Sequence, residues 1–421
     1  MREALAYSTF ALTVTLAVGR PYVGRRWQIG PATAAFGGVL VLLGSGIVHP
    51  GDVASAARTL WRPFITIVSI MITTAAAKRL GVLDRVAAMI FRRADSSVRQ
   101  LFLSVFVLSA ATASLLNNDA AGLLLTPLVL ALIQNRYPGR TELFLPFAFV
   151  VFMAAGVAPF VVSNPMNMIV ASYAGLDFNR YAQWMIPISF AGWIIAFAVL
   201  RRLFAASLAT DPQPGRPAGA ASLRLSSAQR TMLALLVAVL CSYPIVASID
   251  GRAIWMASAT GASLAVVLAW RWGYVKPAEL LANDVAWEIL VFLLAVFVLA
   301  IGLRNVGFVS YLSSVYTDAG IALVGSISAL GSAVLNNHPM AIVNLLALEA
   351  TPGAGHREIL AVLIGSDLGP RLLPIGSLAG LLWLESCRRL GLEIPLRRFV
   401  AVGFAVTIPT LAASLLIHAL R

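Results

Sequence analysis

Apolar runs long enough to cross a bilayer follow one another along the chain, in two series with the same order. The first series predicts spans near residues 5–19, 29–48 and 63–80, an amphipathic stretch near 84–94, an interrupted pair at 99–116 and 119–135, a broken segment at 142–175 and a span at 183–204. The second predicts spans near 230–248, 254–272 and 286–303, an interrupted pair at 318–335 and 339–350, a broken segment at 357–384 and a span at 398–419. Runs of this length indicate helices that span a membrane.

Polar residues interrupt the paired runs at the same place in both series. Asn117-Asn118-Asp119 lies inside the first pair, and Asn336-Asn337-His338-Pro339 lies inside the second. An unpaired polar group at membrane depth has a high free-energy cost, so such a break needs a reason. Its repetition half a chain apart predicts one site assembled from two re-entrant hairpins, as in secondary transporters.

The connection between the two series, residues 206–229, is rich in Pro, Gly, Ala and Ser and is predicted to be a linker. If the interrupted pairs are hairpins, each series crosses the membrane five times, and an odd number inverts the second copy. We therefore predict an all-α integral membrane protein with two inverted structural repeats, 1–205 and 230–421. It would have about 10 transmembrane helices plus two re-entrant hairpins, with helices broken at the midplane.

The basic residues set the predicted orientation. Most of the 31 Lys and Arg residues fall in short loops on the side of the linker. By the positive-inside tendency the linker is cytoplasmic and both termini are outside.

Composition excludes several classes of protein. Of the 421 residues 59% are hydrophobic and 12% charged, with a mean hydropathy of +0.86, which excludes an ordinary soluble protein. The net charge of +13 comes from loops between spans, so the expected environment is membrane lipid and no nucleic acid.

The cysteines Cys241 and Cys387 are isolated and form no metal-ligand spacing. No nucleotide-binding loop and no HExxH or Gly-x-Ser-x-Gly motif occurs, so a transporter is favoured over an enzyme.

The polar breaks have the residue pattern of helix N-termini, with a capping residue before the first turn. Inside the membrane, the free N–H groups and the dipole of such an N-terminus can face a solute. Three such starts are predicted, at Asn118 or Asp119, at His338-Pro339 and at Asn164-Pro165, and a fourth break runs from Asp367 to Pro374. For His338 a capping or packing role and a role in proton handling both stay open. Asn164 and Asn167 could bind solute or only stabilise the broken helix.

The charges beside these breaks disfavour an anion as the transported solute. They favour either a neutral polyhydroxylated solute together with a proton, or a cation. Asp119 and Asp367 offset the positive helix ends, and Arg371 is the basic neighbour, which could form an ion pair with Asp367. An Asn side chain both donates and accepts hydrogen bonds, as a hydroxyl does. Carboxylates inside a membrane commonly carry protons, so Asp119 and Asp367 are the predicted proton-coupling residues.

At these residues the chain resembles the ion transporter superfamily, and most closely the ArsB-type bacterial arsenite efflux pumps. The matching elements are Asn117-Asn118-Asp119 followed by Thr126-Pro127, then Asn336-Asn337 followed by Pro339, and the stretch from Gly365 to Trp383 that contains Asp367-Leu-Gly-Pro370-Arg371 and Ser377. The order of segments is also similar over nearly the whole chain.

The resemblance implies a proton-coupled exporter of arsenite, and of antimonite, as neutral hydroxides across the bacterial inner membrane. It also implies an optional cytoplasmic ATPase as a partner. Arsenous acid is neutral at pH 7 and carries three hydroxyls, which agrees with the charges around the breaks. Two lone cysteines argue against a three-thiolate site, so recognition by hydrogen bonds is expected.

Our working hypothesis is alternating access around a midplane site, with the proton gradient as the energy source and no cofactor or metal. The predicted substrate-binding residues are Asn117, Asn118, Asn336, Asn337, Asn164, Asn167 and Ser377. The nearest alternatives are a sodium/proton antiporter or a silicic or boric acid exporter of the same superfamily. A membrane-embedded enzyme and a channel are more distant ones.

Overall fold

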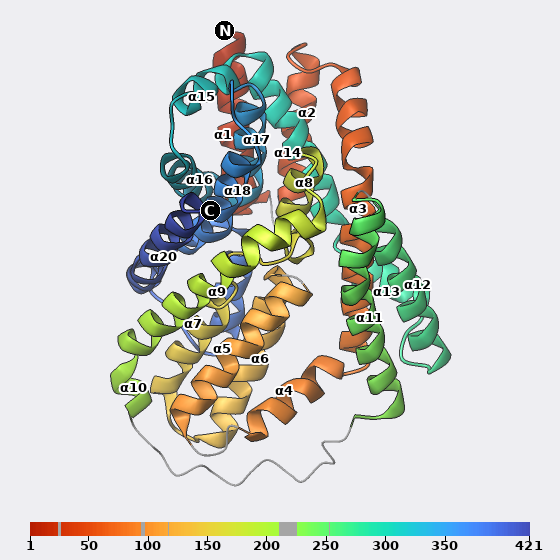
Figure 1. Cartoon of the computed structure of the whole chain (residues 1–421), viewed down its shortest axis with the longest axis vertical. Coiled ribbons are helices and arrows are strands. Elements are labelled where there is room, and N and C mark those ends of the chain that lie inside the picture. The colour runs from red at the N-terminus through yellow and green to blue at the C-terminus, as the bar shows by residue number, and fades with distance from the viewer. Residues whose placement is uncertain (24–26, 94–96, 117, 210–224, 252) are drawn as a thin grey trace.

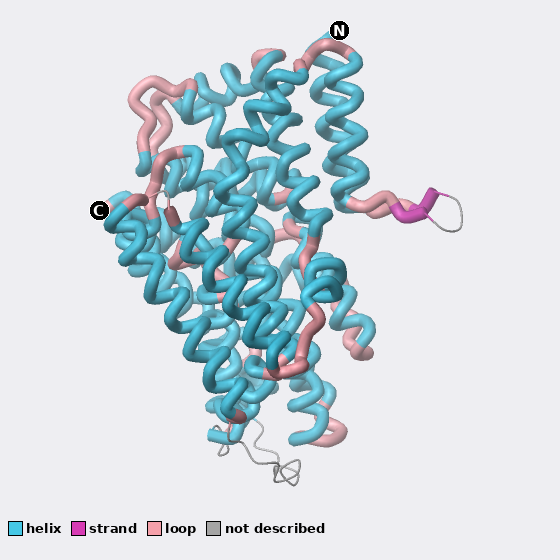
Figure 2. The backbone as a smooth tube through the Cα atoms, turned by 90° about the vertical axis from the view of Figure 1, so that its right-hand side faces the viewer, coloured by secondary structure: helices cyan, strands magenta, loops and turns pink. Residues whose placement is uncertain are grey.

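The computed structural model describes residues 1–421 apart from 24–26, 94–96, 117, 210–224 and 252, and for a few more, among them Asp119, it describes the backbone alone. Within the described residues the regular structure is helical except for two strands of two residues, β1 (Tyr22–Val23) and β2 (Trp27–Gln28), which pair antiparallel. Figure 2 shows this strand pair projecting from an otherwise helical body. The predicted all-α class is confirmed.

The first half of the chain forms one series of helices. It begins with α1 (Arg2–Gly19), α2 (Pro31–Gly44), α3 (Pro50–Arg79) and α4 (Val82–Arg93), and continues with a hairpin of α5 (Val98–Leu115) and α6 (Asn118–Arg136). A broken segment follows, made of η1 (Thr141–Leu143), α7 (Phe144–Met153), η2 (Val161–Ser163) and α8 (Pro165–Tyr173). The series ends with α9 (Phe178–Leu203) and α10 (Ala205–Ala209).

The second half repeats this order. It begins with α11 (Ser227–Ile249), α12 (Ile254–Arg271), α13 (Pro277–Asn283), α14 (Trp287–Asn305) and α15 (Phe308–Tyr316), and continues with a hairpin of α16 (Ile321–Leu335) and α17 (Asn337–Glu349). Its broken segment is α18 (His356–Leu368), η3 (Gly369–Arg371), η4 (Pro374–Gly376) and α19 (Leu378–Arg389). The series ends with α20 (Leu396–Ala419).

The two series are related by exchange and inversion. Helix α2 packs against α14, and α12 packs against α3, which is the same contact with the two halves exchanged. Helices α9 and α20, which end the two series, pack against each other. In Figure 1 the hairpin of α5 and α6 lies in the lower part of the molecule, and α16 and α17 lie in the upper part. The predicted pair of inverted structural repeats is confirmed.

The linker predicted at residues 206–229 falls largely on residues 210–224, which lie outside the described part of the chain. Its boundaries therefore stay a prediction. Helix α9 ends and α11 begins in the lower part of Figure 1, whereas the N-terminus lies at the top.

Seven helices of the described chain are long and apolar enough to cross a membrane, namely α3, α5, α9, α11, α12, α14 and α20. Of these, α5 belongs to the first hairpin. The remaining predicted crossings correspond to α1, which has 18 residues but carries Arg2 and Glu3 in its first turn, to the 14-residue α2 and to the two broken segments. A broken segment divides one crossing between two half-helices, so neither half reaches the length of a full span.

Helix α3 is longer than the predicted span at 63–80. It begins at Pro50, where the side chain of Asp52 accepts a hydrogen bond from the backbone N–H of His49 at 2.8 Å and a capping box starts the helix. Arg58 and Arg62 obscured this part of the helix in the sequence because they line a polar cavity and carry no hydrophobic signal.

The broken segment of the second repeat is fixed against the second hairpin by small residues. A Cβ atom on Gly365 of α18 would lie 2.2 Å from the carbonyl oxygen of Gly325 in α16. One turn further along α16, the hydroxyl of Ser328 donates to the carbonyl oxygen of Val362 at 2.8 Å. Small residues allow helix backbones to approach closely in membranes, where packing and interhelical hydrogen bonds drive association.

Replacing Gly365 by Ala is expected to lower the free energy of unfolding by about 1–3 kcal/mol, because the added methyl group overpacks this contact. Thermal unfolding of the purified protein in detergent measures the change. Gly37→Ala is the matched control, since Gly37 is also helical and a Cβ there meets no atom within 4 Å. A melting temperature of Gly365→Ala equal to that of the wild type would contradict the tight contact.

Candidate functional site

The tips of the two hairpins meet at one small cavity of about 30 Å³. Its wall includes Asn118 at the start of α6 and Asn337 at the start of α17, one residue from each repeat. Asp367, Arg371 and Ser377 of the second broken segment complete its polar lining. The volume holds roughly two water molecules. In this conformation the cavity therefore holds only a very small content.

Two predicted residues of the first tip cannot be placed. Asn117 lies outside the described residues, and so does the side chain of Asp119. Their roles in binding and proton coupling stay predictions.

The second tip has an unusual backbone. Asn336 has φ +75° and ψ +146°, a backbone conformation that is close to a region adopted almost only by glycine. Its side-chain oxygen and that of Asn337 both accept a hydrogen bond from the backbone N–H of His338, at 3.3 and 3.1 Å. Together these contacts start α17 inside the molecule.

The two asparagines of this tip line different cavities. Asn337 lines the shared cavity, whereas Asn336 lines a neighbouring space of about 20 Å³ whose other walls are mostly apolar, with Phe10 of α1 and Phe292 of α14 among them. Asn336 is thus not brought together with the other predicted substrate-binding residues. His338 is buried and its ring meets Phe292 edge-on at 6.1 Å between ring centroids. Its Nε2 has no partner in the described chain.

Asp367 is the centre of a buried hydrogen-bond network between the repeats. Its side chain is 4% exposed and accepts three N–H groups from the first repeat. These come from the backbone of Ala158 at 3.0 Å and from the amides of Asn164 and Asn167, both at 3.1 Å. A buried carboxylate needs such partners, since its desolvation is otherwise very costly.

Helix α8 positions the two amides. The side-chain oxygen of Asn164 accepts from the backbone N–H of Met166 at 3.1 Å and caps the helix, with Pro165 in its first turn. Asn167 lies three residues after Asn164, so both amides lie on one face of the helix and reach Asp367. The polar break at Asn164-Pro165 thus has two roles. It starts α8, and it presents amide groups to the carboxylate of Asp367.

Tyr181 extends this network and was missed by the sequence analysis. Its hydroxyl accepts from the amide of Asn167 at 2.8 Å and donates to the carbonyl oxygen of Ala158 at 3.1 Å. It is fully buried near the start of α9. A single tyrosine near the start of an apolar helix forms no pattern that would mark it as a site residue. The same is true of Ala158, which donates to Asp367 through its backbone N–H.

Arg371 has a partner other than the predicted one. Its Nη1 donates to the carbonyl oxygen of Met153 at 2.9 Å, and no nitrogen of Arg371 lies within 4.0 Å of a carboxylate oxygen in the described chain. Met153 is the last residue of α7, and the final carbonyls of a helix lack intrahelical partners and carry partial negative charge. The helix end therefore competes with Asp367 for the guanidinium and holds it.

Ser377 has in α19 the role that Asn164 has in α8. Its hydroxyl oxygen accepts from the backbone N–H of Gly380 at 2.9 Å and caps the helix. Each broken segment thus contains a half-helix that begins with a capped N-terminus inside the protein.

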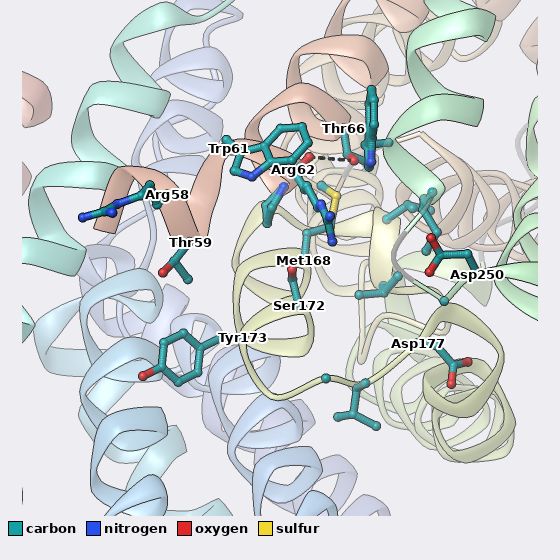
Figure 3. Close-up of a pocket in the computed structure, with 18 residues that line it drawn as sticks. Arg58, Thr59, Trp61, Arg62, Thr66, Met168, Ser172, Tyr173, Asp177 and Asp250 are labelled. Atoms are coloured by element: carbon teal, nitrogen blue, oxygen red, sulfur yellow. Dashed lines mark hydrogen bonds between the residues drawn. The ribbon is translucent and has the colours of Figure 1, made fainter. Parts of the chain in front are cut away.

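A wider cavity of about 740 Å³, which we call the vestibule, lies between α3, α8 and the connection of α11 to α12. Figure 3 shows Arg62 of α3 pointing across it toward Met168 and Ser172 of α8, with Asp177 and Asp250 on another side. The vestibule and the small cavity have no lining residue in common.

Helix α8 separates the vestibule from the network of Asp367. Asn164 and Asn167 lie on the face that bonds Asp367, while Met168 and Ser172 line the vestibule. A small rotation or shift of this short helix would therefore change both surfaces at once.

Within the described chain, no group of three or more His, Cys, Asp or Glu side chains is arranged to hold a metal ion. Cys241 is exposed and Cys387 is buried, and neither forms a disulfide. The polar lining of the small cavity consists of amide, hydroxyl, carboxylate and guanidinium groups, which exchange hydrogen bonds with oxygen-bearing solutes.

The chain is similar to known proteins over almost its full length. Residues 5–419 match the model of a family described as arsenical pump membrane protein. An arsenical pump membrane protein of Escherichia coli is 30% identical over 431 residues, covering 99% of this chain and 98% of the relative. One of Yersinia enterocolitica is 31% identical over 435 residues with the same coverage. Among solved structures, the YdaH transporter of Alcanivorax borkumensis has a TM-score of 0.59 at 15% identity, over 99% of this chain and 96% of that one, which shows a shared fold.

Tyr181→Phe is expected to lower the free energy of unfolding by about 1–3 kcal/mol. It leaves an amide N–H of Asn167 and the carbonyl of Ala158 without a partner in a buried place. Thermal unfolding in detergent measures the loss, with Tyr311→Phe as the control because Tyr311 is 68% exposed. Equal effects of the two substitutions would show that the Tyr181 hydroxyl contributes nothing to the network.

Proposed function

The chain belongs to the arsenical pump membrane protein family, and from this premise we propose that it exports arsenite, and antimonite with it, in exchange for protons. The exported species is the neutral hydroxide, and export proceeds by alternating access across the bacterial inner membrane. The linker is cytoplasmic and both termini are outside. A cytoplasmic ATPase is an optional partner.

The observation that carries the proposal is the small cavity shared by the two hairpin tips. A metalloid hydroxide both donates and accepts hydrogen bonds, and the wall offers both kinds of partner in Asn118, Asn337 and Ser377. Among the described residues of this wall, Arg371 and Asp367 carry opposite charges, so these two charges sum to zero. A site without net charge favours a neutral solute over an ion, because an ion would leave its charge uncompensated in a buried place.

The hydrogen bonds of Asp367 support the proposed proton coupling. Three N–H donors favour the ionised carboxylate, since a carboxylate accepts at both oxygens whereas a protonated carboxyl has become a donor at one of them. A proton on Asp367 therefore weakens the contact of α18 with α8 and residue 158. Because this contact joins the two repeats, protonation gives two arrangements of the repeats different energies.

The route to the outside is the vestibule. In the predicted orientation it lies on the exterior side of α8, and the small cavity of about 30 Å³ lies on the other side. Loss of the bonds between α8 and Asp367 frees α8 to move and opens the cavity toward the vestibule. Closed and open forms would then alternate with the protonation of Asp367.

Asp367→Asn is expected to abolish arsenite-dependent proton movement in everted membrane vesicles, with an initial rate of arsenite uptake below about a tenth of the wild type. An amide cannot carry the proton, and its NH₂ group faces the N–H donors of the first repeat. Asp318→Asn is the control, since Asp318 is exposed in a loop. Asp119→Asn tests the other predicted carrier in the same assay. Wild-type coupling in Asp367→Asn would remove Asp367 from the mechanism.

In a chain freed of cysteine by Cys241→Ala and Cys387→Ala, Ser172→Cys is expected to react with a membrane-impermeant maleimide added to intact cells. Ser172 is exposed and lines the vestibule. Ser189→Cys is the control that should stay unlabelled, because Ser189 is fully buried in α9. Mass spectrometry of the purified protein measures the labelled fraction. Labelling of Ser172→Cys from the cytoplasmic side alone would reverse the proposed direction of the route.

A further inference from the structure

Arg371 has an unused hydrogen-bond donor in a buried place. Its side chain is 3% exposed and lines the small cavity. A guanidinium group carries five N–H donors. Nη1 donates to Met153, whereas Nη2 has no partner in the described chain. A buried charged group with unsatisfied donors is costly, so this nitrogen would gain from an acceptor that came within its reach.

The backbone holds this guanidinium in place. A Cβ atom on Gly403 of α20 would lie 2.2 Å from the carbonyl oxygen of Arg371, so helix α20 packs directly on the backbone of η3. The bond from Nη1 to the end of α7 fixes the other end of the side chain. Arg371 therefore cannot move away to find another acceptor without disturbing two helices.

Within the described chain, no acceptor lies within hydrogen-bond distance of Nη2. Asp367 is the anion that lines the same cavity, but its oxygens already accept three N–H groups and lie beyond 4.0 Å from Arg371. The oxygen of Ser377 accepts from Gly380. Since no described side chain bonds this nitrogen, the content of the cavity is the acceptor that we consider for it.

We propose that Nη2 of Arg371 donates a hydrogen bond to an oxygen atom of the transported solute and makes the site specific for metalloid hydroxides with their oxygens intact. This assignment rests on the proposed function and gives Arg371 a role in binding in place of an ion pair. A guanidinium group donates well to oxygen and poorly to sulfur. Neither Cys241 nor Cys387 lines the small cavity, so no thiolate of the described wall competes for the metalloid.

Arsenite uptake into everted vesicles separates binding from turnover. Arg371→Lys keeps the charge, but a single ammonium on a differently shaped side chain does not reach both Met153 and the solute. We expect the half-saturating arsenite concentration to rise about tenfold, which corresponds to about 1.4 kcal/mol, with a smaller change in the maximal rate. Arg357→Lys is the matched control, because Arg357 also donates to a backbone carbonyl, that of Ala419 at 3.1 Å, but on the exposed surface.

A lower maximal rate with an unchanged half-saturating concentration would overturn the proposal and leave Arg371 with its structural contact to α7 alone. Wild-type vesicles that take up no arsenite would instead refute the proposed function. The two failures are thus distinguishable.

A second measurement uses the unaltered protein, in case Arg371→Lys does not fold. Arsenite is expected to raise the melting temperature of the purified wild type in detergent. Arsenite premixed with an excess of glutathione, which replaces its hydroxyls by thiolates, is expected to raise it much less. Equal stabilisation by the thiolated form would overturn the assignment of Arg371 to a solute oxygen.

Discussion

The fold depends on a carboxylate of one repeat that is held by N–H groups of the other. Asp367 lies in α18, and its three partners lie in the first repeat, between Ala158 and Asn167. These residues lie in the connection after α7 and at the start of α8, so the segment that starts a half-helix also satisfies a buried anion. Removing the carboxylate would therefore leave several donors unpaired at once, which is why the two broken segments have to be considered as one unit.

The sequence predicted the arrangement of helices well because its signals are local. The apolar runs, the cap of Asn164 before Pro165 and the polar tips at Asn118 and Asn337 each depend on residues close together in the chain. Two inversely placed polar breaks were also enough to predict that the tips share a cavity.

The contacts between distant segments could not be predicted in this way. Tyr181 and the backbone of Ala158 carry no special pattern, and the choice of Arg371 between Asp367 and Met153 depends on where α7 ends in space. Asn336 and Asn337 are neighbours in the sequence, but a positive φ at Asn336 turns them toward different cavities. The polar start of α3 was missed because Arg58 and Arg62 face a cavity.

The exchange of partners between α2, α3, α12 and α14 has a consequence for biosynthesis. Helices α2 and α3 leave the ribosome well before α12 and α14, the helices that cover them. Until then their inner faces meet lipid or a chaperone, and a truncated product that contains the first repeat alone would be a substrate for proteolytic quality control. The two repeats have a similar order of helices, but each depends on the other for part of its packed interior.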